Sequence, residues 1–477
     1  MKLAALLAFS TVAFAGDPPA ALTADDVQAA VQNAAASVNS DAMVIAVTDR
    51  SGNILAVFRK ANAPATATGN FGAQVDPSEL AVALARTGAF FSNNQAPLSS
   101  RTVRFISGTH FPLGIMFTDN GPLYGIENTN RGCSLNANFL DGQAVPPATL
   151  IDGVSPGLGP ITGKADINDS DQNAVNPGGV PLYKNGALVG GIGVAGVDGN
   201  VAEFAAISGA IGAGLGPTPA APGVIFINGL ALPFVNQTTQ PGGTSTGDAG
   251  GAFVIGPLDS PGPAPEGDLV TPQAGPVGGL TQNDVQDIVN RAIEAANQTR
   301  AVIRLPIGSR TRMVIAVADL DGAIIALNRM PDAAVFSIDV AVAKARNVID
   351  FTHSLPPLKP GTAVTNRTIG FGAQPFFPPG IDYASPGPFF NLYQSDVATP
   401  CANGGNGIVF FPGSLPLYKN GVLAGGLGVS GDGVDQDDYV TSQAAVNFQA
   451  PDKIHADQFS IFGVRLPYLK FPRNPTN

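Results

Sequence analysis

Apolar residues recur with helical spacing at two places in the chain, each time directly after a Leu-Thr pair. The apolar positions are Val27, Ala30, Val31 and Ala34 in one place and Val285, Ile288, Val289 and Ala292 in the other. This period predicts an amphipathic helix, and the preceding Thr23 or Thr281 is a favoured N-cap. A second apolar stretch of helical type covers residues 80–91 and again 340–351.

Continuous apolar runs follow the first helix in both places. Residues 43–49 read MVIAVTD, and residues 313–319 read MVIAVAD. Each run reaches a turn that contains a glycine, and a second apolar run follows at 54–59 or 324–329. Two such runs joined by a short turn predict a β-hairpin in each place.

A longer segment also occurs twice. Residues 181–196 read PLYKNGALVGGIGVAG, and residues 416–431 read PLYKNGVLAGGLGVSG. Asn-Gly between strand-like runs predicts a hairpin with a type I′ turn. The outgoing strand carries three glycines, which indicate that something comes close to it. Either a helix packs there, or Gly191 and Gly426 line the floor of a ligand pocket.

These elements follow the same order twice, so the sequence predicts a tandem duplication. The first copy covers residues 20–235 and the second covers residues 279–470. Each ends in a strand-like piece, at 226–234 and 460–468, and the Arg101–Val103 stretch of the first copy reads as a strand. Residues 236–278 are rich in Gly, Pro, Ser and Thr, a composition typical of a linker without a core of its own.

Composition and charge narrow the possible functions. The 477 residues are enough for about two to four domains. The net charge of −11, without a basic cluster, disfavours nucleic acid and anionic membranes as partners. Residues 1–15 resemble a secretory signal peptide that is cleaved after Ala15, and no later apolar run is long enough to span a membrane. We therefore expect a secreted or periplasmic protein.

The two cysteines, Cys133 and Cys401, fall within two residues of equivalent places in the two copies. In an oxidising compartment they could form a disulfide, and the alternative is two free thiols. Neither belongs to a CxxC pattern, which disfavours zinc and covalently attached haem.

The repeated motifs resemble those of the GlcG/HbpS-like haem-binding family, the DUF336 domain. They are LTxxD, the MVIAV hairpin, the helix DVAVAKAR at 339–346 and the PLYKNG segment. The resemblance implies an α/β (α+β) fold, in which each copy has a mixed, mainly antiparallel sheet of about five strands flanked by helices. It also implies that the copies pack as an intrachain pseudo-dimer, that the protein could form homo-oligomers, and that haem or another tetrapyrrole is the ligand. Asp435-Gln436-Asp437 suits the family, whereas Asp198-Gly199-Asn200 departs from it.

Three histidines are available as iron ligands. His110, beside Phe105 and Phe111, is the better candidate for the haem metal, His353 ends a predicted helix, and His455 lies in a polar stretch. The copies share no histidine, so the sequence does not support a duplicated histidine site. The alternatives are a partly buried loop histidine at 110, a helix-dipole role at 353, or a tyrosine ligand at Tyr183 or Tyr418.

Four arginines occupy matched positions and could bind haem propionates or another carboxylate. They are Arg86 with Arg346 and Arg101 with Arg367. The alternative is a salt bridge to an acidic residue such as Asp49 or Asp319. Lys184 and Lys419 are expected in solvent, and residues 166–171 form either a calcium loop or an ordinary polar loop.

The sequence favours an exported haem-binding protein that serves sequestration, storage or sensing. Two alternatives remain open. One is an enzyme that uses the matched arginines to hold a small organic acid, and the other is a secreted structural or self-assembling protein. We find no Ser-His-Asp order, P-loop or dinucleotide fingerprint, so no catalytic residue is named.

Overall fold

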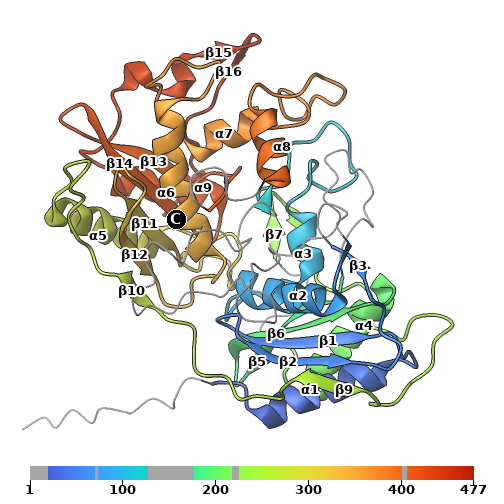
Figure 1. Cartoon of the computed structure of the whole chain (residues 1–477). Helices are drawn as coiled ribbons and strands as arrows, with labels where there is room; N and C mark the ends of the chain where they lie inside the picture. Colours follow the sequence, from blue (N-terminus) through green and yellow to red (C-terminus); the bar gives the residue numbers. More distant parts are fainter. Residues whose placement is uncertain (1–19, 70–73, 127–176, 218–224, 400–405, 477) are drawn as a thin grey trace, which may run out of the picture.

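The computed structural model describes residues 20–69, 74–126, 177–217, 225–399 and 406–476. Two regions, each built on one sheet, lie side by side in Figure 1. The predicted signal peptide, both cysteines and residues 166–171 lie outside the described residues.

The first sheet has five strands, and each strand runs antiparallel to its neighbours. Their order is β5 (Gly179–Lys184), β6 (Ala187–Ala195), β1 (Val44–Asp49), β2 (Ile54–Arg59) and β9 (Ala252–Ile255). One face packs on α1 (Ala24–Ser37) and α4 (Gly199–Gly212), and the other packs on α2 (Pro77–Phe91). The short helix α3 (Ser100–Phe105) follows α2.

The second sheet repeats this arrangement. Its order is β10 (Gly267–Val270), β12 (Ile324–Arg329), β11 (Val314–Ala318), β14 (Val422–Ser430) and β13 (Ser414–Lys419). The helices are α5 (Gln282–Gln298), α6 (Ser337–His353), α7 (Asn366–Gly372), α8 (Phe390–Ala398) and α9 (Val434–Ala444). The predicted fold class, with about five strands per copy, is confirmed.

Strand register matches between the two sheets. Val44 pairs with Arg59 and Ala195, and Val314 pairs with Arg329 and Ser430. The pairing of the first hairpin also shifts at the equivalent place in both copies, after Val47 and after Val317. Equivalent residues of the two copies therefore occupy equivalent positions in the two sheets.

The predicted helix starts and turns are confirmed. Thr23 and Thr281 cap α1 and α5, each in a capping box with an aspartate three residues later. Asn185 and Asn420 have φ of 52° and 53°, and the glycine after each is also left-handed, as a type I′ turn requires. The lysines before these turns are not simply solvated, because Lys184 and Lys419 pair with Asp26 and Asp284 at 2.5 and 2.7 Å.

Close helix packing accounts for the glycine-rich strands. A Cβ atom added at Gly191 would overlap the carbonyl oxygen of Ala85 in α2, and one added at Gly426 would overlap that of Ala345 in α6. Helix backbone therefore lies directly against both glycines, in the space where the pocket hypothesis would place a ligand.

Residues 236–278 do more than connect the copies. They contribute β9 to the first sheet and β10 to the second, and each is an edge strand. Before β9, the amide of Gly247 donates to the carbonyl of Ala36 at 3.0 Å, and that of Asn39 donates to Ser245 at 2.6 Å. An edge strand needs backbone hydrogen bonds rather than a core of its own, so this apolar-poor segment can still join a sheet.

Strands of two residues form small hairpins outside the two main sheets. The strand-like ends of the copies pair as β7 (Phe226–Ile227) with β8 (Leu230–Ala231) and β15 (Ser460–Ile461) with β16 (Val464–Arg465). A further hairpin joins β3 (Ala67–Thr68) to β4 (Gln74–Val75).

The expectation of a strand at Arg101–Val103 is wrong, because these residues belong to α3. Ser99 and Thr102 form a capping box that starts a helix there. The capping side chains therefore determine the local structure, although the stretch is too short to show a helical period.

The two copies pack directly against each other through apolar side chains. Phe91 at the end of α2 stacks on Phe336 at the start of α6, with ring centroids 4.2 Å apart. Tyr124 of the first copy enters the core of the second and stacks on Tyr393 at 5.3 Å. At the phenylalanine contact, opposite ends of the two matched helices meet.

Candidate functional site

His110 lies in the loop after α3, where a residue of the second copy holds its ring. Its Nε2 is 3.0 Å from Oδ1 and 3.1 Å from Oδ2 of Asp382. The side chain is only 3% exposed, and its Nδ1 atom is buried without a hydrogen-bond partner in the described part of the chain. Asp382 also accepts a hydrogen bond from the amide of Phe117 at 3.0 Å, so the carboxylate is itself fixed.

Apolar side chains crowd the loops around this pair. The rings of Phe105 and Phe111 lie 5.6 Å apart, edge to face, and those of Phe117 and Tyr383 lie 6.2 Å apart across the two copies. The large apolar side chains that these loops leave exposed are Ile115, Met116, Phe117, Ile381 and Tyr383. An imidazole nitrogen without a partner, beside an apolar surface, suits an iron ligand better than a solvated proton carrier.

The other two histidines lie elsewhere. His353 is exposed at the C-terminal end of α6, as predicted from the sequence. His455 stacks on Tyr468 at 4.0 Å, and its Nε2 is 3.0 Å from the carbonyl oxygen of Ala450. Within the described ranges, no group of three or more His, Cys, Asp or Glu residues is placed to hold a metal ion.

Arg86 in the first copy and Arg346 in the second make equivalent hydrogen bonds. Each Nε donates to a backbone carbonyl in the turn of the first hairpin, to Gly52 at 3.0 Å and to Gly322 at 2.9 Å. Burial lowers the pKa of Arg86 to about 10 and also lowers that of Arg346. Each guanidinium therefore ties the end of the sheet to the helix above it. One terminal nitrogen of Arg346 is buried without a partner among the described residues.

Arg101 and Arg367 form ion pairs with the last helix of their own copy. Arg101 donates to both oxygens of Glu203 at 2.7 and 3.0 Å. Arg367 donates to Asp438 at 2.5 Å and to Asp435 at 2.6 Å. Burial lowers the pKa of Arg367, but these carboxylates outweigh it and raise the pKa above its usual value. Arg101 and Arg367 therefore form salt bridges, which was the alternative to a role in ligand binding, although their partners are not Asp49 and Asp319.

Both candidate tyrosines are buried. The hydroxyl of Tyr183 donates to the carbonyl oxygen of Asn93 at 2.8 Å. Burial raises the pKa of both Tyr183 and Tyr418, which disfavours the phenolate that would bind iron.

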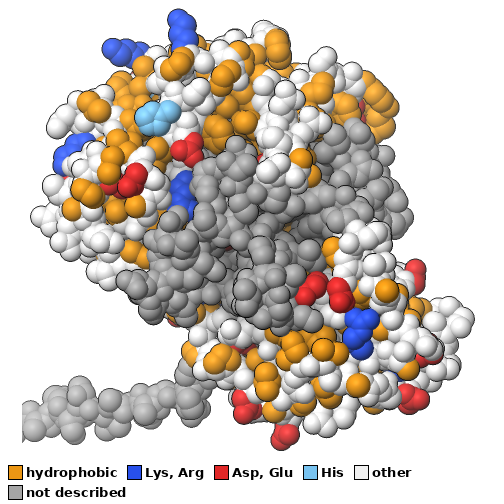
Figure 2. Space-filling model, in the orientation of Figure 1, with side chains coloured by type: hydrophobic (Ala, Val, Ile, Leu, Met, Phe, Trp, Pro, Cys, Tyr) orange, Lys and Arg blue, Asp and Glu red, His pale blue; other side chains and the backbone are white. Residues whose placement is uncertain are grey.

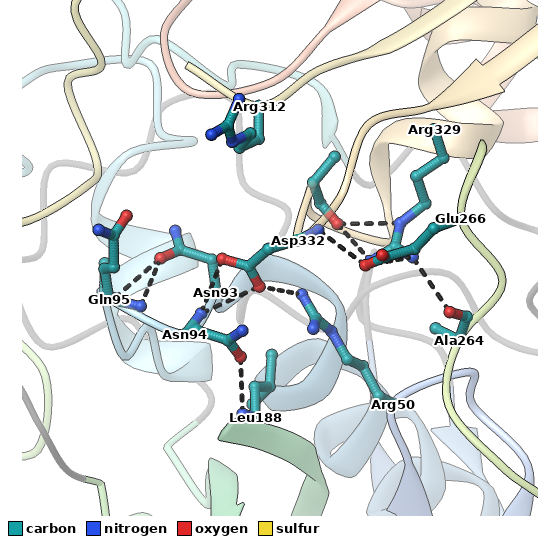
Figure 3. A network of polar contacts seen from close by, with 12 residues as sticks. Arg50, Asn93, Asn94, Gln95, Leu188, Ala264, Glu266, Arg312, Arg329 and Asp332 are labelled. Atoms are coloured by element: carbon teal, nitrogen blue, oxygen red, sulfur yellow. Dashed lines mark hydrogen bonds and ion pairs between the residues drawn. The ribbon is translucent and has the colours of Figure 1, made fainter. Parts of the chain in front are cut away.

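A network of charged groups joins the copies around Asp332 (Figure 3). Asp332 accepts from Arg50 of the first copy and from Arg304 of the second, both at 2.6 Å, and from the amide of Asn94 at 3.2 Å. Burial opposes ionisation of Asp332, but the two arginines outweigh it and hold its pKa below the usual value. Beside it, burial lowers the pKa of Arg329 to about 9. Sequence reasoning missed this network, because Arg50 and Asp332 have no charged counterparts in the other copy.

Sequence reasoning also missed a buried ion pair under α6. Lys344 Nζ lies 3.1 Å from Oδ2 of Asp437 and donates to the carbonyl oxygen of Val429 at 2.8 Å. Burial lowers the pKa of Lys344 and raises that of Asp437 to about 7. The available signal was a lysine inside the otherwise apolar stretch 340–345.

Figure 2 shows the basic side chains of one face as small separate groups among apolar and uncharged atoms. Among the described helices, none combines the length and the apolar character needed to cross a membrane.

A family model described as "Haem degrading protein HbpS-like" matches residues 280–446. No curated protein matches the chain. The family match covers most of the second copy, from α5 to α9.

Three solved structures are also similar. A PduOC:heme complex aligns at 24% identity over 36% of this chain and 96% of its own, with a TM-score of 0.26. The Klebsiella pneumoniae protein ORFY, of DUF336, aligns at 21% identity over 36% and 90%, with a TM-score of 0.25. A double mutant of Streptomyces reticuli HbpS aligns at 20% identity over 35% and 86%, with a TM-score of 0.23. The sequence match therefore shows that residues 280–446 are similar to the HbpS-like family.

Proposed function

We propose that this protein is exported and binds haem or a closely related tetrapyrrole, for sequestration, storage or sensing. The HbpS-like match of residues 280–446 supports this function. The main observation in favour of this site is the environment of His110. One of its ring nitrogens contacts Asp382, and the other is buried without a hydrogen-bond partner among the described residues.

The His110–Asp382 pair fits the chemistry of an iron ligand. Histidines that bind metals commonly give their second ring nitrogen to a carboxylate, which fixes the orientation of the ring and increases its basicity. Asp382 holds the ring in this way from the other copy, and the amide of Phe117 holds Asp382. Bound haem would supply a redox-active iron. The chain supplies the nitrogen ligand and the apolar residues around it.

The exposed apolar side chains of the two loops would cover a flat porphyrin. Phe117 and Tyr383 are 59% and 78% exposed, so their rings are available to stack on a ligand. His110 itself is 3% exposed, so binding requires residues 111–117 to move away from the ring. We therefore expect slow association that speeds up when this loop is loosened.

The test is a hemin titration of the mature protein, followed in the Soret band. We expect the wild type to bind one equivalent of hemin per chain and His110→Ala to bind none. Asp382→Asn should bind hemin more weakly, because an asparagine amide can still orient the imidazole ring but lacks the negative charge of the carboxylate. His455→Ala is the matched control, since it removes a histidine that already has a partner. Unchanged binding by His110→Ala would reject the site, and no saturable binding by the wild type would reject the function.

Export and the disulfide remain part of the proposal. Mass spectrometry of protein from a secreting host should give an N-terminus after Ala15. A mass lower than that of the reduced chain by two hydrogen atoms would establish a Cys133–Cys401 bond, and two alkylated thiols in the unreduced protein would exclude it.

A further inference from the structure

The first copy contains a cavity of about 470 Å³ between α2, the end of β6 and the start of α4. Its wall combines buried apolar side chains, which include Leu84 of α2, Ala195 of β6 and Ala202 of α4, with polar atoms that make up the larger part of the accessible lining. Cavities of this size hold molecules of one or two aromatic rings. None of its lining residues belongs to the His110 site or to the network around Asp332.

The same place in the second copy is filled by charged side chains. Gly178 lies against Val194 and Ala202, and Gly413 lies against Val429 and Asp437, so Ala202 and Asp437 are equivalent. Gly193 packs on Ala81 and Ala85, and Gly428 packs on Ala341 and Ala345, which makes Leu84 equivalent to Lys344. The buried Lys344–Asp437 pair therefore stands where the first copy has Leu84 and Ala202.

At two further positions, an apolar residue of the first copy is replaced by a polar residue in the second. Sheet register makes Ala195 equivalent to Ser430, and continuing it makes Val197 equivalent to Asp432. Asp432 is fully buried and pairs with Arg304, which comes from a segment between α5 and β11 that is longer than the one between α1 and β1. The first copy thus has an apolar residue at each of four positions where the second copy has a polar one.

Charge at the rim restricts what can enter. Asp198 is the one charged residue that lines the cavity within the described chain, and it is exposed. Its carboxylate also accepts the amide hydrogen of Asn200 at 2.9 Å as the N-cap of α4. The hydroxyl of Thr66 lies on the same lining and offers a neutral hydrogen-bonding group. This carboxylate disfavours anions at the rim, and the positive N-terminal end of α4 offsets part of its charge.

We propose that this cavity binds one small, apolar molecule that is neutral or cationic. The site is separate from the proposed haem site, and its negative rim disfavours the carboxylates that haem carries. In the second copy the Lys344–Asp437 pair fills the equivalent place, so the described residues leave no room there for the same ligand.

The test uses the neutral fluorophore N-phenylnaphthylamine, which brightens in apolar surroundings, with the mature full-length protein. We expect saturable binding of one probe per chain. Ala202→Phe, which fills the cavity, should weaken it by at least about tenfold. The double variant Leu84→Lys with Ala202→Asp, which imports the pair of the second copy, should do the same. Ile211→Phe is the matched control, because it adds the same ring to α4 at a side chain that is 63% exposed.

Charge selectivity is tested with the anionic probe anilinonaphthalene sulfonate. It should bind the wild type more weakly than the neutral probe and should gain affinity in Asp198→Asn. Far-UV circular dichroism identifies any variant that has not folded, and Ala202→Phe and the double variant fill the same cavity independently. The proposal is overturned if the folded wild type shows no saturable binding of the neutral probe, or if folded Ala202→Phe binds it as tightly as Ile211→Phe does. Neither result depends on hemin binding, which His110→Ala tests separately.

Discussion

Lys344 and Asp437 show how a single pair of residues can differ between two otherwise matched copies. Both side chains are buried, and Nζ of Lys344 lies 3.1 Å from Oδ2 of Asp437, whereas Oδ1 of Asp437 has no hydrogen-bond partner among the described residues. Their equivalents, Leu84 and Ala202, are also buried but apolar. A buried ion pair can often be exchanged for apolar residues at little cost, whereas removal of one partner leaves an uncompensated charge.

We therefore expect strong coupling between these two positions. At pH 8, above the pKa of about 7 that burial gives Asp437, Lys344→Leu alone should lower the free energy of unfolding by about 3 to 5 kcal/mol, because the carboxylate stays buried without its cation. Lys344→Leu combined with Asp437→Ala should lose less than the single variant does. Urea unfolding of the four proteins of this double-mutant cycle measures the coupling. Losses that simply add would show that the pair does not act as a unit.

The same pair should give stability a pH dependence. Burial raises the pKa of Asp437 to about 7 from an ordinary value of 3.8, so between these values the folded state holds a proton that the unfolded state has lost. The stabilisation is complete below the unfolded pKa and is lost as the pH rises through the folded one. Between pH 5 and pH 7.5, the wild type should lose stability relative to Asp437→Asn, which cannot titrate. A parallel pH dependence of the two proteins in urea unfolding would contradict this assignment.

Residues near one another in sequence were predictable, and those brought together by packing were not. The capping threonines and the Asn-Gly turns act within a few residues, so their patterns identified them. His110 was singled out as a ligand from its aromatic neighbours, but its partner Asp382 is 272 positions away and no local pattern points to it. The Lys344–Asp437 pair was missed for the same reason.

At the scale of the elements, each glycine-rich strand lies in close contact with a helix. Backbone atoms of α2 and α6 occupy the space where the side chains of Gly191 and Gly426 would be. The strand must therefore lack side chains at these positions so that the helix can approach it. Each helix is then tied to the turn of the first hairpin by Arg86 or Arg346.

A methyl group at this contact should be poorly tolerated. Gly426→Ala should destabilise the protein by about 1 to 3 kcal/mol or more, because the obstacle is the backbone carbonyl of Ala345 and not a mobile side chain. Gly242→Ala is the matched control, since an added Cβ there meets nothing within 4 Å. Thermal unfolding compares the two, and equal midpoints would show that α6 can move aside.

Long periodic elements followed from the sequence, whereas the edge strands did not. The first helix of each copy has apolar positions that repeat with a helical period, and the central hairpin strands are continuous apolar runs. By contrast, β9 and β10 are four residues each, and the exposed positions of β9 alternate with half-buried ones. They are held by backbone pairing to β2 and β12, which leaves almost no trace in the side chains. The short helix α3 was mistaken for a strand because three residues give no period.

At the scale of the whole molecule, the two copies are joined by an apolar contact and a charged one. Phe91 and Phe336 stack in the apolar part, and Asp332 binds Arg50 across the junction. Arg304, the second cation on Asp332, comes from the same copy as Asp332 itself. Without Asp332, two largely buried guanidinium groups would face each other without a shared anion.

Asp332→Ala should therefore weaken the junction more than either sheet. We expect a loss of about 3 to 5 kcal/mol and a calorimetric transition that broadens or splits as the copies unfold separately. Asp321→Ala is the matched control, since this exposed turn residue only caps the amide of Ala323 at 3.0 Å. A single sharp transition at the wild-type temperature would show that the apolar contact alone couples the copies.

The connecting segment contributes one strand to each sheet, and the positions of these strands determine where the chain can be split into two fragments that each keep a complete sheet. Residues 256–266 lie between β9 and β10 and belong to neither strand. A break within them would leave each fragment with all five strands of its sheet, whereas a break at the sequence boundary of either copy would remove one. A recombination event near residue 261 could therefore replace either half of the chain with that of a relative while both five-stranded sheets remain complete.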